Sequence, residues 1–206
     1  MIRSLAIALC IGVFSASAAA ADAITMLKAF ADRTVSASGR FTQQAESSTE
    51  KISGVFAFSR PGKFLWRTDA PFKQTIVSDA KTLWIYDVDL NQVTVRNVKG
   101  AIDAGPATLL FGGSNPEQFF NLSILTEEGE LSWVRAVPKA DDAAFSFVDI
   151  GFDAEGLPKK MRLADRFSEK TLYTLEAVRV PSQIDKKVYE FTVPAGADVL
   201  RDTSSE

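Results

Sequence analysis

The chain contains no histidine among its 206 residues, and this absence excludes several kinds of chemistry. Ser-His-Asp and Cys-His catalysis both need an imidazole, and histidine is also the commonest zinc ligand. Neither a G-x-S-x-G nor a G-x-x-x-x-G-K-[ST] sequence is present. Acidic turns at residues 127–130 and 141–142 could hold a metal ion, but such turns are more often solvated loops. We therefore predict that the protein is not an enzyme and has no metal or other cofactor.

Cysteine occurs once, at Cys10, inside an apolar run near the N-terminus. A lipid-modified cysteine needs small residues just before it, and Leu9 does not fit that requirement. Loss of the N-terminal segment would leave a chain without disulfides or thiols, so the fold must depend on its core. The 23 Lys and Arg residues are balanced by 26 Asp and Glu residues. The chain therefore lacks the large basic field that binds nucleic acid.

The first 21 residues have the features of a secretory signal peptide. A basic residue, Arg3, precedes an apolar run from Leu5 to Phe14, and the small residues that follow offer cleavage between about 18 and 21. An uncleaved membrane anchor is the alternative, but it would need about 20 apolar residues. We predict a signal peptide over residues 1–21 and a single domain over residues 22–206.

Aromatic residues alternate with other residues along consecutive strand-like runs between Gly54 and Asp87. Alternate side chains of a strand share a face, so matching registers would join the aromatic side chains into one apolar wall. These residues are Phe56, Phe58, Phe64, Trp66, Trp84 and Tyr86. Turn sequences at 60–62, 69–71 and 79–81 favour an antiparallel meander. From the pattern alone, the wall is either the core of a sandwich or the lining of a ligand cavity.

Seven further runs alternate apolar and polar residues between turn sequences. They span residues 38–46, 91–97, 131–138, 145–152, 159–165, 172–180 and 188–193. With the four runs of the aromatic block they make about eleven strands. Eleven antiparallel strands without an internal repeat predict a mainly β protein with short helices, folded as an incomplete barrel whose mouth helices can cover.

Two segments are candidates for such a cover. Asp22 is placed to cap a helix whose apolar residues Leu27, Ala31 and Val35 recur at four-residue intervals, and this helix either covers an open end of the sheet or closes a ligand cavity. Glycines frame a second apolar segment, residues 107–111. That segment is either a buried loop plug or a movable lid whose glycines act as hinges.

Three motifs resemble the LolA family of periplasmic lipoprotein carriers. They are RFTQQ at 40–44, SRPGKFLW at 59–66 and QTIVSDAKTLWIYD at 74–87. The match departs at Ala80, where the family commonly has glycine, and it is dense over residues 40–97 and looser afterwards. The resemblance implies an incomplete antiparallel β-barrel beneath a helical lid, with a cavity that holds acyl chains.

The resemblance also assigns roles to particular residues. The cavity would be lined by Phe56, Phe58, Phe64, Trp66, Ile76, Trp84 and Tyr86, of which Phe56 and Phe58 are included by their face alone. Leu109, Leu110 and Phe111 would be the inward residues of the lid. Arg60 matches the basic residue that holds the lid shut by hydrogen-bonding its backbone, a task that suits the several planar donors of a guanidinium group.

The partners come from the resemblance as well. It implies a periplasmic monomer that takes acylated lipoproteins from an inner-membrane ABC-type releasing complex and gives them to an outer-membrane acceptor. One alternative is a periplasmic carrier of free lipid or glycolipid with the same fold. Another is a lipid-modified outer-membrane acceptor, which the position of Cys10 disfavours.

Overall fold

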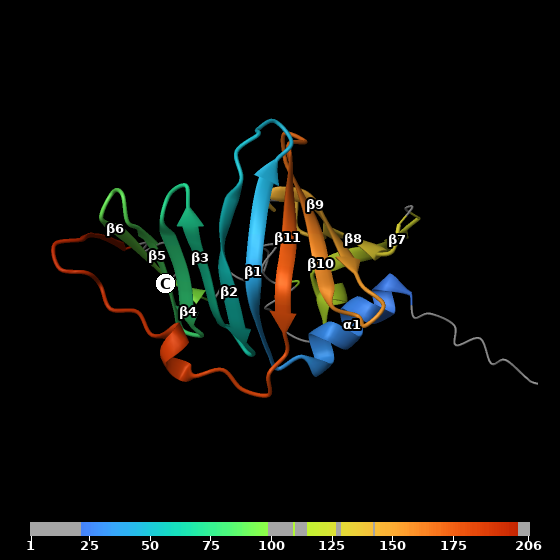
Figure 1. The fold of residues 1–206 in the computed structure, drawn as a ribbon, viewed down its shortest axis with the longest axis horizontal. Helices are drawn as coiled ribbons and strands as arrows, with labels where there is room; N and C mark the ends of the chain where they lie inside the picture. Colours follow the sequence, from blue (N-terminus) through green and yellow to red (C-terminus); the bar gives the residue numbers. More distant parts are fainter. Residues whose placement is uncertain (1–21, 99–108, 110–114, 127–128, 142, 202–206) are drawn as a thin grey trace, which may run out of the picture.

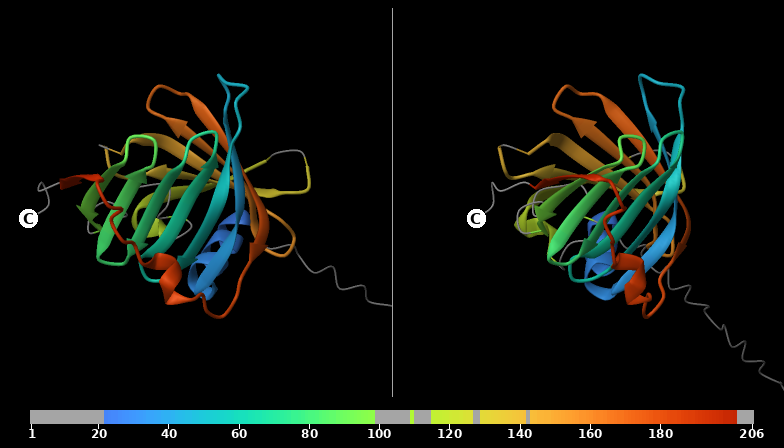
Figure 2. Two further views of the ribbon diagram at one scale, coloured as in Figure 1. Left: turned by 60° about the vertical axis from the view of Figure 1, so that its left-hand side comes forward. Right: turned by 90° about the vertical axis from the view of Figure 1, so that its left-hand side faces the viewer.

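The computed structural model describes residues 22–98, 109, 115–126, 129–141 and 143–201, so the predicted signal peptide lies outside the described residues. These residues form one sheet that curls around a helix (Figures 1 and 2). The strands of the N-terminal half are β1 (Ser36–Ala45), β2 (Ile52–Ser59), β3 (Lys63–Ala70), β4 (Gln74–Asp79), β5 (Thr82–Asp87) and β6 (Gln92–Asn97). Those of the C-terminal half are β7 (Phe120–Leu125), β8 (Ser132–Pro138), β9 (Phe145–Phe152), β10 (Pro158–Asp165), β11 (Lys170–Arg179) and β12 (Asp198–Arg201).

The sheet of the described residues has twelve strands in the order β12-β6-β5-β4-β3-β2-β1-β11-β10-β9-β8-β7. Adjacent strands of this sheet are antiparallel, except that β12 pairs with β6 in parallel. β1 joins the two halves because it pairs with both β2 and β11. The ends of the order, β12 and β7, are not paired with each other, which confirms the predicted incomplete barrel.

Irregular pairings help the sheet to curl. The register shifts between Ser38 and Arg40 in β1, and between Ser53 and Gly54 in β2. β10 shifts at both of its ends, after Pro158 and after Ala164. A bulge of this kind bends a strand and increases its twist, so the sheet wraps rather than lying flat.

The helix α1 (Ala23–Arg33) lies on the concave face of the sheet and contacts β7, β8 and β9. As predicted, Asp22 caps it by accepting a hydrogen bond from the Thr25 N–H at 2.8 Å. Leu27, Phe30 and Ala31 are buried beneath it. Val35 follows the helix and is exposed, so its assignment to the apolar helical face was wrong. Within the described part of the chain, none of the helices has the length and apolarity needed to cross a membrane.

The C-terminal segment departs from the sequence prediction. Residues 188–193 are not a strand, because the 3₁₀ helix η2 (Lys186–Tyr189) occupies their beginning and an extended segment follows. This segment crosses the outer face of the N-terminal half (red in Figure 2) and ends in β12. Tyr189 is buried there, with its hydroxyl 2.9 Å from the Ser59 Oγ. The alternation that predicted a strand reflects contact with the outer face of an existing sheet, not membership of the sheet.

A buried ion pair joins three strands on the outer face of the C-terminal half. Asp149 in β9 is 1% exposed and accepts from the Arg135 Nε at 2.7 Å and Nη2 at 2.9 Å. The Arg162 Nη2 lies 3.4 Å from the same carboxylate. Arg135 and Arg162 lie opposite Asp149 in β8 and β10, over the rings of Phe147 and Trp133 respectively. One carboxylate therefore bridges the arginines of both neighbouring strands.

Replacing Asp149 with alanine is expected to destabilise the protein by about 2 kcal/mol, because Arg135 then loses a charged hydrogen-bond acceptor and Arg162 an ion-pair partner. Urea unfolding followed by tryptophan fluorescence measures the change. Asp69→Ala is the matched control, since Asp69 pairs with Arg67 at an exposed site and its loss should cost under about 1 kcal/mol. Equal destabilisation by the two variants would contradict this account.

Candidate functional site

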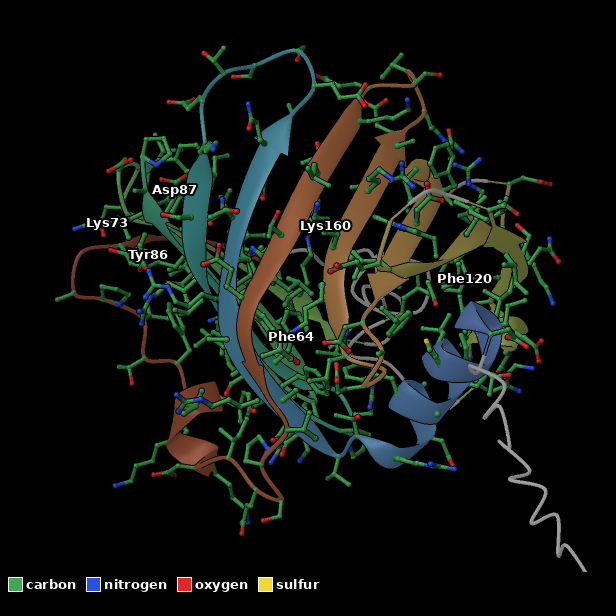
Figure 3. The ribbon with its side chains drawn as sticks, turned by 45° about the vertical axis from the view of Figure 1, so that its right-hand side comes forward. Phe64, Lys73, Tyr86, Asp87, Phe120 and Lys160 are labelled. Atoms are coloured by element: carbon green, nitrogen blue, oxygen red, sulfur yellow. The ribbon has the colours of Figure 1, made fainter. Side chains whose placement is uncertain are left out.

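The concave face carries a continuous apolar wall. Its members on β2–β4 face one another across the ladders, with Phe56 opposite Trp66, Phe58 opposite Phe64, and Trp66 opposite Ile76. The three phenylalanines are buried, and Trp66 and Ile76 pack against the same core. Phe64 and Phe120 come from the two halves of the sheet to the concave side (Figure 3). The sequence prediction that Phe56, Phe58, Phe64, Trp66 and Ile76 share a face is therefore confirmed.

Trp84 and Tyr86 lie on the opposite face, so their assignment to the cavity wall was wrong. Trp84 pairs with Val77, whereas Ile76 pairs with Ile85. The two-residue turn between β4 and β5 causes this change, because an even-length connection moves odd-numbered residues onto the face that even-numbered ones held before. Ala80 in that turn has φ of 81°, a conformation that favours glycine.

Trp84 and Tyr86 instead support the C-terminal segment on the outer face. The ring of Phe191 lies 5.9 Å from the Trp84 ring and 6.0 Å from the Tyr86 ring, centroid to centroid. The Tyr86 hydroxyl donates to the Asn91 Oδ1 at 3.2 Å. These aromatic residues therefore form a second, structural contact that is separate from the concave wall.

Two glycines shape the wall and escaped the sequence analysis. Gly39 lies opposite Phe56, and Gly54 lies opposite Phe41. A Cβ atom at Gly39 would lie 2.8 Å from the Phe56 ring, and one at Gly54 would lie 2.7 Å from the Phe41 ring. Each ring thus occupies the space that a side chain on the neighbouring strand would fill. The signal in the sequence was a glycine two residues from a phenylalanine in both strands.

The rings of Phe41 and Phe56 lie over these glycines and stack on Trp66. We call these three residues the aromatic shelf. The Phe41 and Trp66 centroids are 3.9 Å apart with 22° between the planes, and the Phe56 and Trp66 centroids are 6.1 Å apart at 25°. Tyr173 of β11 meets Trp66 edge-on at 6.0 Å. The shelf presents broad ring surface to the concave side and carries few polar atoms, which suits an apolar ligand of variable shape.

Arg60 follows β2 and connects it to the C-terminal end of α1. Its Nη1 donates to the carbonyl oxygen of Phe30 at 3.2 Å and to that of Thr34. The guanidinium carbon lies 4.8 Å from the centroid of the Phe58 ring. Burial lowers the Arg60 pKa to about 10, so the side chain stays charged at neutral pH. A cation suits this place because the last carbonyls of a helix lack partners within it and carry partial negative charge.

One predicted lid residue lies within the described part of the chain. Leu109 is buried and belongs to the core cluster that contains α1 and the wall. Leu110 and Phe111 lie outside the described residues, and so do the glycines that frame the segment. An ion pair of 2.8 Å between Lys28 and Glu117 joins α1 to the 3₁₀ helix η1 (Pro116–Gln118), which follows the segment.

A groove of about 600 Å³ runs between α1 and the β9–β10 turn. Its apolar lining includes Met26, Phe30, Leu157 and Val180. Phe30 also belongs to the core behind the groove, where its ring contacts those of Phe58 and Phe152.

The described residues contain no group of three or more His, Cys, Asp or Glu side chains arranged to hold a metal ion. The features that the described residues do bring together are an apolar concave wall, an amphipathic helix over it and a cation that fastens the helix. This combination defines the class of the protein as an open β-barrel with an apolar concave face beneath a helical cover.

Comparison with known proteins identifies the family. A model of the family described as "Outer membrane lipoprotein carrier protein LolA" matches residues 32–192. A protein of Bordetella pertussis named outer-membrane lipoprotein carrier protein is 41% identical over 98% of this chain and 99% of its own. A protein of the same name from Nitrosomonas europaea is 36% identical over 88% of this chain and 90% of its own. The chain therefore belongs to the LolA family of outer-membrane lipoprotein carrier proteins.

Solved structures show the same fold in more distant proteins. An uncharacterized conserved protein from Thermus thermophilus superimposes with a TM-score of 0.55 at 12% identity, covering 87% of this chain and 97% of that one. MucB superimposes with a TM-score of 0.51 at 15% identity, covering 88% of this chain and 65% of that one. At these identities the likeness concerns the fold alone.

Proposed function

We propose that this protein is a periplasmic chaperone that binds the acyl chains of lipoproteins released from the inner membrane. The observation that carries the proposal is the apolar wall on the concave face of a sheet whose family is named for lipoprotein carriage. The wall offers aromatic and aliphatic surface. Contacts with such a surface do not require the ligand to take one orientation, which suits hydrocarbon chains on many different cargo proteins. The names of the relatives favour this cargo over a free lipid or glycolipid.

The size of the transfer problem explains why a carrier is needed. Three acyl chains contain on the order of 45 methylene groups, and each costs roughly 0.8 kcal/mol when it leaves an apolar environment for water. The gross cost of about 35 kcal/mol prevents free diffusion of a lipoprotein between two membranes. We infer that an ABC-type complex of the inner membrane supplies the cargo and that an outer-membrane acceptor receives it.

Release requires that the carrier hold its cargo less tightly than the acceptor does. In our proposal, α1 and the segment around Leu109 form the helical lid, and Arg60 fastens the closed, empty state through the carbonyl groups of α1. Opening then uses part of the binding free energy of the cargo. Leu110 and Phe111 would face the same cavity, and the sequence of residues 1–21 would direct the protein to the periplasm.

Quenching by a brominated acyl chain tests where the ligand lies. Trp66 is on the concave face, whereas Trp84 and Trp133 pair with residues of the outer face. We expect a brominated fatty acid to quench tryptophan fluorescence, and Trp66→Phe to remove most of that quenching. Trp84→Phe is the matched control and should keep it. Retention of quenching in Trp66→Phe would place the ligand elsewhere.

The identity of the cargo needs a second measurement. Native mass spectrometry of the protein purified from its periplasm should show bound lipoprotein. A free lipid or glycolipid in its place would support the alternative function, a periplasmic carrier of free lipid. An empty protein under loading conditions would contradict both functions.

A further inference from the structure

Two polar side chains of the concave face adjoin the aromatic shelf near the end where β1 turns into β2. Gln43 and Tyr173 lie opposite each other in the ladder between β1 and β11. Tyr173 packs against the inner core, and Gln43 follows buried Phe41 by two residues, so it points to the same side. Tyr173 meets the Trp66 ring of the shelf edge-on, so this polar pair lies at the border of the apolar wall.

The Tyr173 hydroxyl has hydrogen-bonding capacity that the described part of the chain does not use. The other two tyrosine hydroxyls bind protein groups, since Tyr86 donates to Asn91 and Tyr189 pairs with Ser59. Among the residues that the structure describes, neither the Tyr173 hydroxyl nor the Gln43 amide forms a side-chain hydrogen bond. Burial raises the Tyr173 pKa, so the hydroxyl keeps its proton at neutral pH and is able to donate it.

The surroundings of Tyr173 indicate what kind of acceptor would reach it. Its ring touches Trp66 of the aromatic shelf, and the wall continues from the shelf to Phe58 and α1. Because the wall is apolar, the part of a ligand that lies along it is expected to be a hydrocarbon chain. The polar group that ends such a chain in a lipid is the carbonyl of an ester or amide, which accepts hydrogen bonds and donates none through its oxygen.

We propose that Tyr173 donates a hydrogen bond to the carbonyl oxygen at the root of a bound acyl chain, with Gln43 beside it and the tail directed towards α1. This proposal rests on the proposed function and adds an orientation to it. A uniformly apolar wall lets a chain slide, whereas one fixed donor sets the depth to which the chain enters. Tyr173 is thus a ligand-positioning residue.

Two probes of equal chain length separate the hydroxyl from the apolar surface. One is a diacylglycerol with ester links, and the other is a dialkylglycerol whose ether links lack the carbonyl oxygen. Competition with a bound fluorescent fatty acid gives the affinity of each. We expect wild type to bind the ester about fivefold more tightly than the ether, as one neutral hydrogen bond allows.

Tyr173→Phe keeps the ring and removes the hydroxyl, so it should abolish the preference for the ester while leaving ether binding unchanged. Tyr86→Phe is the matched control, because it removes a hydroxyl from the outer face, and it should keep the preference. A preference that survives in Tyr173→Phe, or that is absent from wild type, overturns this proposal. Failure of wild type to bind either probe would instead overturn the proposed function.

Discussion

Arg60→Leu is expected to retain its lipoprotein cargo and to fail in handing it to the acceptor. The leucine side chain keeps an apolar contact with Phe58 but loses the hydrogen bonds to the carbonyl oxygens of Phe30 and Thr34. Hydrogen bonds to a charged group are worth about 1.5–3 kcal/mol, so the closed, empty state should lose roughly 2 kcal/mol. The apparent affinity for cargo then rises roughly thirtyfold, because opening no longer opposes binding.

Transfer of lipoprotein from the loaded variant to a purified acceptor measures this effect. Arg67→Leu is the matched control, since Arg67 is an exposed arginine of β3 that pairs with Asp69, and its transfer should be normal. Arg60→Lys separates charge from geometry, because an ammonium group keeps the cation but offers no planar fork, and it should transfer at an intermediate level. Wild-type transfer by Arg60→Leu would show that Arg60 does not hold the empty state closed.

Gly54→Ala is expected to destabilise the protein more than any other glycine-to-alanine substitution in the described strands. The new Cβ would lie 1.9 Å from the carbonyl oxygen of Arg67 and 2.7 Å from the Phe41 ring. The carbonyl belongs to the backbone of β3, so the strands must separate or the ring must leave the shelf. Overpacking of this kind costs about 3 kcal/mol or more. The unfolding midpoint in urea measures the loss.

Ser53→Ala is the control for Gly54→Ala, because Ser53 is the adjacent residue and faces the outer side of the sheet. Its unfolding midpoint should change little. A near-normal midpoint for Gly54→Ala would mean that the close approach of β3 is relieved at no cost. If Gly54→Ala folds, brominated fatty acid should quench it less than wild type, since the Phe41 ring can no longer lie flat beside Trp66.

The sequence predicted the strands of the aromatic block well, because alternation is a local property. β2, β3, β4 and β5 all appear where their apolar residues recur at every second position. The β2–β3 and β3–β4 connections have three residues each, an odd number, so Phe58, Phe64 and Ile76 stayed on one face. The β4–β5 turn has two residues, an even number. Trp84 therefore lies on the outer face, whereas a three-residue turn would have placed it on the concave face.

The features that the sequence did not predict are those that depend on distant partners. β12 is four residues long and exists because β6 offers an edge for parallel pairing. In residues 188–193, Tyr189 contacts Ser59 and Phe191 contacts Trp84 and Tyr86 on the outer face, so these alternate residues resemble a strand in the sequence. The role of Gly39 and Gly54 required the cross-strand register, since each accommodates a ring from a neighbouring strand.

The segment of residues 180–197, which connects β11 to β12, has a mechanical consequence. It is pinned on the convex side at both ends, where Ser36 donates to the Pro181 carbonyl oxygen and Asn91 donates to that of Gly196. Between these points Tyr189 and Phe191 press on the back of the sheet. We expect these contacts to hold the curvature of the N-terminal half in both the loaded and the empty carrier, so that release of cargo requires no refolding of this half.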